Sequence, residues 1–431
     1  MSNKVKIGSF CKVRRGASPR PIDNPNYFGG NVGWIRISDV TKSFKYLNKT
    51  EQYVSSLGES LSVRVDKGDL VMSICGTIGR PIIINIPSCI HDGFVQLYEI
   101  QEADKEYLYY ILQHHEKDLE RKGQPGTQVN LNTTIVENFE VYFPTKPIQT
   151  KIAHILSTAD AVIEKTQAAI AKYKAIKQGM LHDLFTRGID LQTGKLHPRY
   201  EDAPELYKPS QLGWIPKEWE VKKLGDVGEV RMCRRVFNYE TSDQGDIPFY
   251  KIGTFGKQPD AYISQKLYDS YRQQFSFPNK GDILISAAGT IGRTIIYDGT
   301  PSYFQDSNIV WIENYGELIS NEYLYQVFQI VEYKTEGGTI QRLYNSILKS
   351  AVFPCPSKPE QKLITERLQA IDNKLQTEQT YLQKMQSLKK GLMEDLLSGR
   401  KCLNGNFDDL HDSLDAALSN QSLQSQQSNK S

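Results

Sequence analysis

The strongest constraint on the fold is that the sequence contains the same unit twice, about 213 residues apart. Gly76-Thr77-Ile78-Gly79-Arg80 recurs letter for letter as Gly289-Thr290-Ile291-Gly292-Arg293. Further matches follow in the same order: Tyr107-Leu108-Tyr109 with Tyr323-Leu324-Tyr325, and Phe143-Pro144 with Phe353-Pro354. The period is far longer than the roughly 20–50 residues of a solenoid repeat. We therefore predict one domain duplicated in tandem.

Each copy ends in a long stretch with apolar residues at steps of four and three, which is the spacing of a coiled-coil helix. The first seam consists of Ile152, Leu156, Ala159, Ile163, Ile170, Tyr173, Ile176, Met180 and Leu184. The second consists of Ile364, Leu368, Ile371, Leu375, Leu382, Met385, Leu388, Leu392 and Leu396. Both have one polar position at the same place, Thr166 and Glu378. A helix with one apolar seam needs a partner, so we predict that the two helices pair with each other.

These patterns predict an α+β fold. In each copy, a mixed, strand-rich globular domain precedes the long helix, because short β-branched and aromatic runs alternate with Gly, Pro, Asn and Asp. The predicted segments are globular domain 1 (1–146), long helix 1 (147–187), a linker (188–221), globular domain 2 (222–357), long helix 2 (358–399) and a tail (400–431). Short helices are expected at 104–119 and 320–332. The tail ends in Ser, Gln and Asn and is predicted to be disordered.

Composition excludes several classes of protein. Hydrophobic residues make up 39% of the chain and charged residues 24%, which is enough to build cores. No run approaches 18 apolar residues, and no apolar segment follows the N-terminus, so neither a membrane span nor a secretory signal is expected. The six cysteines form no C-x-x-C pair and no ligand spacing with the seven histidines. We therefore expect no zinc site, no disulfide framework and a cytoplasmic location.

Catalytic motifs are not found in the sequence. A phosphate-binding loop requires G-x-x-x-x-G-K-[ST], and a dinucleotide-binding turn requires G-x-G-x-x-G; neither occurs. No Ser/His/Asp arrangement stands out, although the members of such a triad are often far apart in sequence. We predict a non-catalytic chain with no metal and no cofactor of its own.

Basic residues are unevenly distributed, although the net charge is only +2. Two stretches, 1–45 and 222–257, are rich in Lys and Arg and interleaved with aromatics, a combination that can bind a polyanion. Charge alone favours an ordinary solvated surface, but the equivalence of Arg14 and Arg231 favours contact with DNA. The repeated Gly-Thr-Ile-Gly-Arg indicates a tight turn for its glycines. For Arg80 and Arg293, phosphate contact and plain surface charge both remain open.

Taken together, the ordered motifs resemble the specificity subunit of a type I restriction–modification system, over about residues 1–400. The resemblance rests on both Gly-Thr-Ile-Gly motifs, Gly126-Thr127-Gln128-x-Asn130-Leu131, Phe143-Pro144, the blocks from Lys146-Pro147 to Leu184 and from Lys358-Pro359 to Leu396, and Leu212-Gly213-Trp214-Ile215-Pro216-x-x-Trp219. Copy two departs from the pattern, because it has Gly338-Thr339-Ile340-Gln341-Arg342 where copy one has Gly126-Thr127-Gln128-Val129-Asn130.

The resemblance implies that each globular domain reads one half of a split site in double-stranded DNA. It also implies that the helices form an antiparallel coiled coil and dock two methyltransferase subunits, which translocating restriction subunits join. S-adenosylmethionine, ATP and Mg would belong to those partners, and no membrane is involved. The candidates for DNA contact are Arg14, Arg15, Arg20, Arg36, Lys42, Arg80, Gln128 and Asn130 in the first copy, and Arg231, Arg234, Arg235, Lys251, Lys257, Arg293, Gln341 and Arg342 in the second.

Two other functions compete with this prediction. A coiled-coil adaptor with protein-binding globular domains would show no preference for a DNA sequence. A complete DNA-modifying enzyme would transfer methyl groups by itself, and the missing glycine loop argues against it. If the helices act as a ruler, lengthening the 152–184 seam by one turn changes the spacer between the half-sites.

Overall fold

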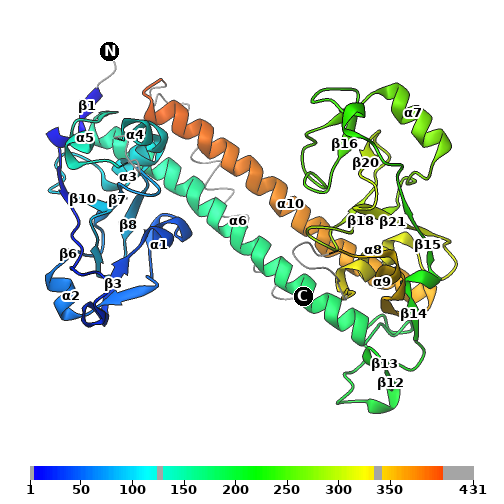
Figure 1. Cartoon of the computed structure of the whole chain (residues 1–431). Helices are drawn as coiled ribbons and strands as arrows, with labels where there is room; N and C mark the ends of the chain where they lie inside the picture. The colour runs from blue at the N-terminus through cyan, green and yellow to red at the C-terminus, as the bar shows by residue number, and fades with distance from the viewer. Residues whose placement is uncertain (1–3, 124–129, 334–341, 401–431) are drawn as a thin grey trace. The chain divides into compact units, whose positions relative to one another are not determined.

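The computed structural model describes residues 4–123, 130–333 and 342–400. Contacts divide the chain into two compact units, one of Met1–Ala169 with Glu378–Ser431 and one of Ile170–Thr377. Each unit contains one copy of the globular domain together with parts of both long helices (Figure 1). The predicted α+β fold with a tandem duplication is confirmed.

Domain 1 is built on two mixed sheets and one two-stranded ladder. The five-stranded sheet has the order β2-β10-β7-β8-β4, the four-stranded sheet β5-β3-β9-β6, and β1 pairs with β11. The strands are β1 (Lys4–Lys6), β2 (Lys12–Arg15), β3 (Phe28–Ile35), β4 (Tyr46–Leu47), β5 (Gln52–Val54), β6 (Val63–Val65), β7 (Leu70–Ser73), β8 (Pro81–Ile84), β9 (Ser88–Ile90), β10 (Phe94–Tyr98) and β11 (Glu140–Tyr142). The helices are α1 (Ile37–Lys42), α2 (Ser56–Ser60), α3 (Lys105–His114), α4 (Glu116–Lys122) and α5 (Thr133–Glu137).

Domain 2 repeats this plan with fewer strands. Its sheets have the orders β15-β21-β18-β19 and β17-β16-β20, and β14 pairs with β22. The strands are β14 (Glu220–Lys223), β15 (Gly228–Met232), β16 (Ile247–Tyr250), β17 (Tyr262–Ile263), β18 (Ile283–Ser286), β19 (Thr294–Ile296), β20 (Tyr303–Phe304), β21 (Ile309–Asn314) and β22 (Val352–Cys355). The helices are α7 (Gln265–Gln274), α8 (Asn321–Ile330) and α9 (Asn345–Ser350). In both domains the first strand pairs antiparallel with the strand that leads into a long helix.

The long helices are α6 (Lys146–Thr186) and α10 (Lys358–Leu397), of 41 and 40 residues. Each has proline in its second position, where the missing N–H breaks no helical hydrogen bond. Each is followed two residues later by a glycine with φ of +71°, Gly188 or Gly399, the left-handed conformation that ends a helix. Helices α6 and α10 pack together, as predicted (Figure 1).

Two ion pairs establish that the helices run antiparallel. Lys389 lies 2.6 Å from Asp160, and Asp372 lies 2.6 Å from Lys177, so the partner number falls on α10 as it rises on α6. Most seam residues are buried or half-buried, and each fully buried Leu or Ile contributes roughly 1.5–3 kcal/mol. Ile176 is an exception, because it is 38% exposed.

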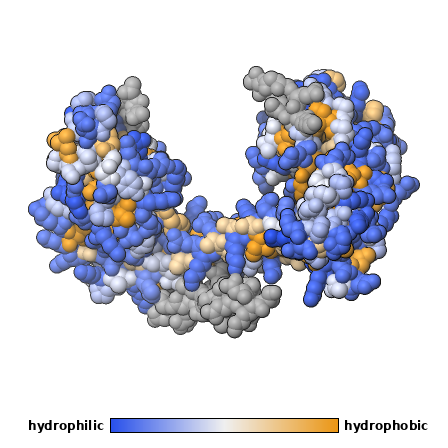
Figure 2. Space-filling model, turned by 90° about the horizontal axis from the view of Figure 1, so that it is seen from below, coloured by the Kyte–Doolittle hydropathy of each residue, from blue (hydrophilic) through white to orange (hydrophobic). Residues whose placement is uncertain are grey.

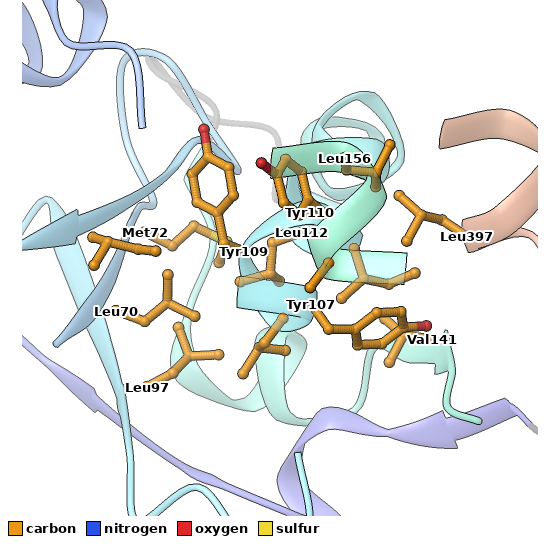
Figure 3. Packing of buried hydrophobic residues seen from close by; sticks show 14 of the residues in the cluster. Leu70, Met72, Leu97, Tyr107, Tyr109, Tyr110, Leu112, Val141, Leu156 and Leu397 are labelled. Carbon is orange, nitrogen blue, oxygen red and sulfur yellow. The ribbon is translucent and has the colours of Figure 1, made fainter. Parts of the chain in front are cut away.

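The core of domain 1 extends onto both long helices. Leu70, Met72 and Leu97 of the five-stranded sheet face the side of α3 that carries Tyr109. Tyr107 and Tyr110 leave other sides of α3, because the Tyr107 hydroxyl donates to the Tyr142 carbonyl at 2.6 Å and the Tyr110 hydroxyl donates to Asp160 at 2.7 Å. On the other side of α3 lie Leu156 of α6 and Leu397 of α10 (Figure 3). The core of domain 2 likewise includes Phe185, whose ring stacks on Tyr323 at 5.4 Å. Each domain is therefore fixed to a helix pair rather than tethered to it.

The connector between the copies forms a hairpin, β12 (Tyr207–Ser210) with β13 (Gly213–Pro216). Trp219 is buried and donates its indole N–H to Glu360 of α10 at 2.9 Å, whereas Trp214 remains on the surface and stacks on Tyr200. No helix among the described residues is long and apolar enough to cross a bilayer. Hydrophilic side chains predominate on the face shown in Figure 2. Except for Arg400, the predicted tail lies outside the described residues.

Candidate DNA interface

The Gly-Thr-Ile-Gly motif forms the same turn in both domains. It joins β7 to β8 in domain 1 and β18 to β19 in domain 2. Both glycines of each motif have positive φ, from +65° at Gly289 to +83° at Gly292. Only glycine adopts this conformation without strain, so the repeated glycines are explained by the turn itself.

A buried serine at the end of the preceding strand closes each turn. The Ser286 hydroxyl donates to the Thr290 carbonyl at 2.5 Å and accepts from the Arg293 amide at 2.9 Å. Ser73 makes the same two contacts, with Thr77 and with the amide of Arg80 at 3.2 Å. The backbone of both arginines is thereby fixed by an uncharged side chain.

In each domain a later segment of the chain, called here the return segment, is hydrogen-bonded next to the turn. It consists of residues 130–131 in domain 1 and residues 342–343 in domain 2. The amide of Leu131 donates to the Ile74 carbonyl at 2.9 Å, and the amide of Leu343 donates to the Ala287 carbonyl at 2.8 Å. This places the exposed residues Asn130 and Arg342 beside the two turns. The candidates Gln128 and Gln341 lie outside the described residues.

Arg14 and Arg231 occupy equivalent strands, and both have partners within the chain. The Nε of Arg14 donates to Gln96 at 2.6 Å, and its guanidinium lies 5.1 Å from the centre of the Tyr98 ring. The Nε of Arg231 lies 2.8 Å from a carboxylate oxygen of Glu313. Both arginines are exposed, but neither extends freely into solvent.

In domain 1, Asp92 binds two further candidates. Arg15 donates to its backbone carbonyl at 2.7 Å, and Arg20 pairs with its carboxylate at 3.0 Å. Partial burial raises the pKa of Asp92, but the Ser18 hydroxyl and the Arg20 guanidinium outweigh it and hold this pKa below its usual value. Asp92 is therefore ionised at neutral pH and offsets the positive charge around it.

In domain 2, two candidates line a cavity of about 220 Å³ next to the turn. Arg293 donates to the Phe255 carbonyl at 2.9 Å, and Lys257 lies on the same cavity. Lys251 pairs with Asp260 at 2.9 Å. Arg234 and Arg235 instead lie over the rings of Phe275 and Phe237.

The other basic residues of the first stretch have different surroundings. Arg36 is exposed just before α1, Lys42 pairs with Glu51, and Arg80 is half-buried. Lys45 is buried between α3 and α6, 2.8 Å from a carboxylate oxygen of Glu106. Lys45 is thus part of the core and does not contribute to the basic surface that the sequence of residues 1–45 suggested.

Two parts of the chain, residues 2–172 and 216–387, match the family model described as "Type I restriction modification DNA specificity domain". The chain belongs to this family. The resemblance inferred from the sequence is confirmed, and the prediction of a recognition subunit rather than an enzyme agrees with it.

Similar proteins are described as specificity subunits of type I restriction enzymes. A putative type I restriction enzyme specificity subunit of Haemophilus influenzae is 56% identical over 165 residues, which is 38% of this chain and 43% of that protein. The MjaVIII specificity subunit of Methanocaldococcus jannaschii is 24% identical over 425 residues, 94% of each chain. Among solved structures, the S subunit from M. genitalium has a TM-score of 0.57 at 15% identity, over 92% of this chain and 96% of that one. Because the sequence identity is only 15%, this structural similarity shows a shared fold alone.

Sequence reasoning overlooked several residues that shape the candidate interface. Asp92 pairs with the candidate Arg20 and accepts a hydrogen bond from the candidate Arg15, and Ser73 and Ser286 hold the turns. The serines left a signal, because they occupy the same place in both copies; Asp92 left none. Among the described residues, no group of three or more His, Cys, Asp or Glu side chains is placed to hold a metal ion.

Proposed function

We propose that this chain is the non-catalytic subunit that gives a type I restriction–modification enzyme its sequence specificity. Each globular domain would read one half of a bipartite site in duplex DNA. The observation that carries the proposal is the duplication: both domains present an equivalent turn, return segment and basic strand, in a chain of the DNA specificity family.

The chemistry of base recognition supports two different half-sites. Arginine pairs with guanine through two hydrogen bonds, and Asn or Gln pairs with adenine, at about 1–3 kcal/mol for each good pair. The return segments place Asn130 beside the turn of domain 1 and Arg342 beside that of domain 2. These residue types favour different bases, so the two domains are suited to different sequences.

The partners follow from the duplicated helices. We propose that α6 and α10 offer equivalent surfaces to two methyltransferase subunits, and that restriction subunits join that assembly. S-adenosylmethionine, ATP and Mg would be bound by those subunits. The support within this chain is the matching of ion pairs and seam positions between the two helices.

A map of DNA methylation tests the proposal. The chain would be expressed with its methyltransferase in a host without other modification systems, and the modified bases located by sequencing. We expect a motif of two specific parts separated by a fixed, unspecific spacer. The control is the methyltransferase alone, which should leave no such motif.

Two outcomes would contradict the proposal. A contiguous motif would show that the two domains do not read separate half-sites. A motif that is the same without this chain would favour the adaptor, and an electrophoretic shift lacking any sequence preference would then support that alternative.

A further inference from the structure

An exposed segment in domain 2 combines arginine with aromatic side chains. It follows β15, runs from Arg234 to Tyr239, and is called here the arginine–aromatic segment. Tyr239 is 82% exposed and Phe237 is 42% exposed, and their rings stack with centroids 5.6 Å apart and planes 6° apart. Exposed aromatic side chains that lie next to each other are typical of interaction surfaces.

The two arginines of this segment carry uncompensated charge. The guanidinium of Arg235 lies 5.7 Å from the centre of the Phe237 ring, and that of Arg234 lies 5.2 Å from Phe275. Neither forms an ion pair with any carboxylate in the described part of the chain. The carboxylate of Glu240 is occupied, because it accepts the Phe237 amide at 2.8 Å and the Tyr271 hydroxyl at 3.0 Å.

The equivalent segment of domain 1 has the opposite character. It begins at Arg15, the last residue of β2, and continues to Arg20, and both arginines are bound to Asp92 as described above. The strand registers place Ser307 where domain 1 has Asp92, and the neighbouring Asp306 forms no ion pair with Arg234 or Arg235 among the described residues. Asp92 therefore offsets the arginine charge in domain 1, whereas no carboxylate among the described residues does so for Arg234 and Arg235 in domain 2.

We infer that the arginine–aromatic segment is the main electrostatic anchor of this subunit on duplex DNA. Arg234 and Arg235 contact backbone phosphates, and the Phe237–Tyr239 pair packs against the adjoining sugars. In domain 1, a phosphate that approaches Arg15 or Arg20 also meets the negative charge of Asp92, so that domain adds less non-specific affinity. The inference rests on the proposed function, since it presupposes that both domains meet DNA.

The salt dependence of binding tests this inference. The full chain would bind a fluorescein-labelled 30-base-pair duplex of mixed sequence at a series of KCl concentrations, followed by fluorescence anisotropy. Each phosphate contact contributes about 0.9 to the slope of log affinity against log salt. The variant R234A/R235A should therefore lose up to about 1.8 of that slope. The matched variant R15A/R20A should lose less than half as much, and D92N should increase the slope.

The outcomes separate the inference from the proposed function. Equal losses in the two double variants, or an unchanged slope in R234A/R235A, would overturn the anchor while leaving DNA binding intact. A wild-type chain that binds the duplex at no salt concentration would instead contradict the proposed function. The four substituted arginines lie on the surface, so unchanged thermal unfolding of the two double variants should accompany the expected result.

Discussion

Lys45 shows how an apparently free surface charge becomes a structural residue. Its ammonium lies 2.8 Å from Glu106 and 3.3 Å from the Ser157 hydroxyl, and the Tyr46 hydroxyl donates to the same glutamate at 2.6 Å. Burial of a lysine is tolerated only when the charge is paired and hydrogen-bonded. The network joins α3 to α6, so this charge holds domain 1 on its helix.

The Glu106 network predicts a pH-dependent contribution to stability. Burial raises the pKa of Glu106, but hydrogen bonds from Lys45, Tyr46 and Ser157 outweigh it and hold this pKa below its usual value. The stabilisation is therefore present above the unfolded pKa of about 4.3 and is lost as pH falls through the lower folded pKa. The melting temperature of E106Q should lie below that of wild type at pH 7, and the gap should narrow below about pH 4.

The exposed Glu120 supplies the control for this prediction. E120Q should melt like wild type at both pH values, because its carboxylate is solvated. If the melting temperatures of wild type and E106Q differ by the same amount at pH 3 and at pH 7, the charge of Glu106 does not contribute to stability. The lower melting temperature of E106Q would then come from the changed shape and hydrogen bonding of the side chain.

The long helices are joined by ion pairs that the duplication itself explains. Asp372 is the counterpart of Asp160, and Lys389 is the counterpart of Lys177, each 212 positions further along the chain. Each aspartate therefore pairs with the lysine of the other helix, as expected for two copies of one helix packed antiparallel. The two pairs differ in surroundings, because Lys389 also faces the rings of Phe44 and Tyr110.

This difference predicts unequal costs for the same substitution. Asp160 is 5% exposed and Asp372 is 23% exposed, so Asp160 is less able to regain water when its lysine is removed. Loss of one partner of a buried pair costs about 3–5 kcal/mol, and less where solvent can enter. In thermal unfolding followed by circular dichroism, K389M should melt lowest, K177M next, and the exposed control K384M close to wild type. Equal melting of K389M and K177M would show that burial does not determine the cost.

Local patterns predicted the helices well and the sheets poorly. The seam spacing and the glycines at 188 and 399 located α6 and α10 closely, because helix geometry depends on neighbours three and four positions away. The parallel pairing of β3 with β9, and of β16 with β20, joins strands that are far apart in sequence and left no local signal. The same holds for Asp92, whose effect on Arg15 and Arg20 depends on the tertiary fold.

Duplication preserved how each domain is attached and changed what each domain exposes. Tyr107 and Tyr323 both donate a buried hydroxyl to a carbonyl of the strand before a long helix, at 2.6 and 2.8 Å. Gln149 and Gln361, in the first turn of α6 and α10, both donate to a proline carbonyl just before their helix. The exposed segments after β2 and β15 share no such contacts. A shared scaffold with divergent surfaces is what two different half-sites require.

The proposed ruler can be tested by lengthening both helices without disturbing their seam. Residues 162–168 of α6 and 374–380 of α10 are equivalent heptads, and copying each in place keeps the apolar seam in phase. Seven residues add about 10.5 Å at 1.5 Å per residue. At roughly 3.4 Å per base pair, the spacer between methylated half-sites should grow by about three base pairs, with both half-sites unchanged. Copying only the α6 heptad is the control, because it misaligns the Lys177–Asp372 pair and should destabilise the chain rather than shift the spacer. A spacer of unchanged length in the stable double insertion would show that the helices do not determine the distance.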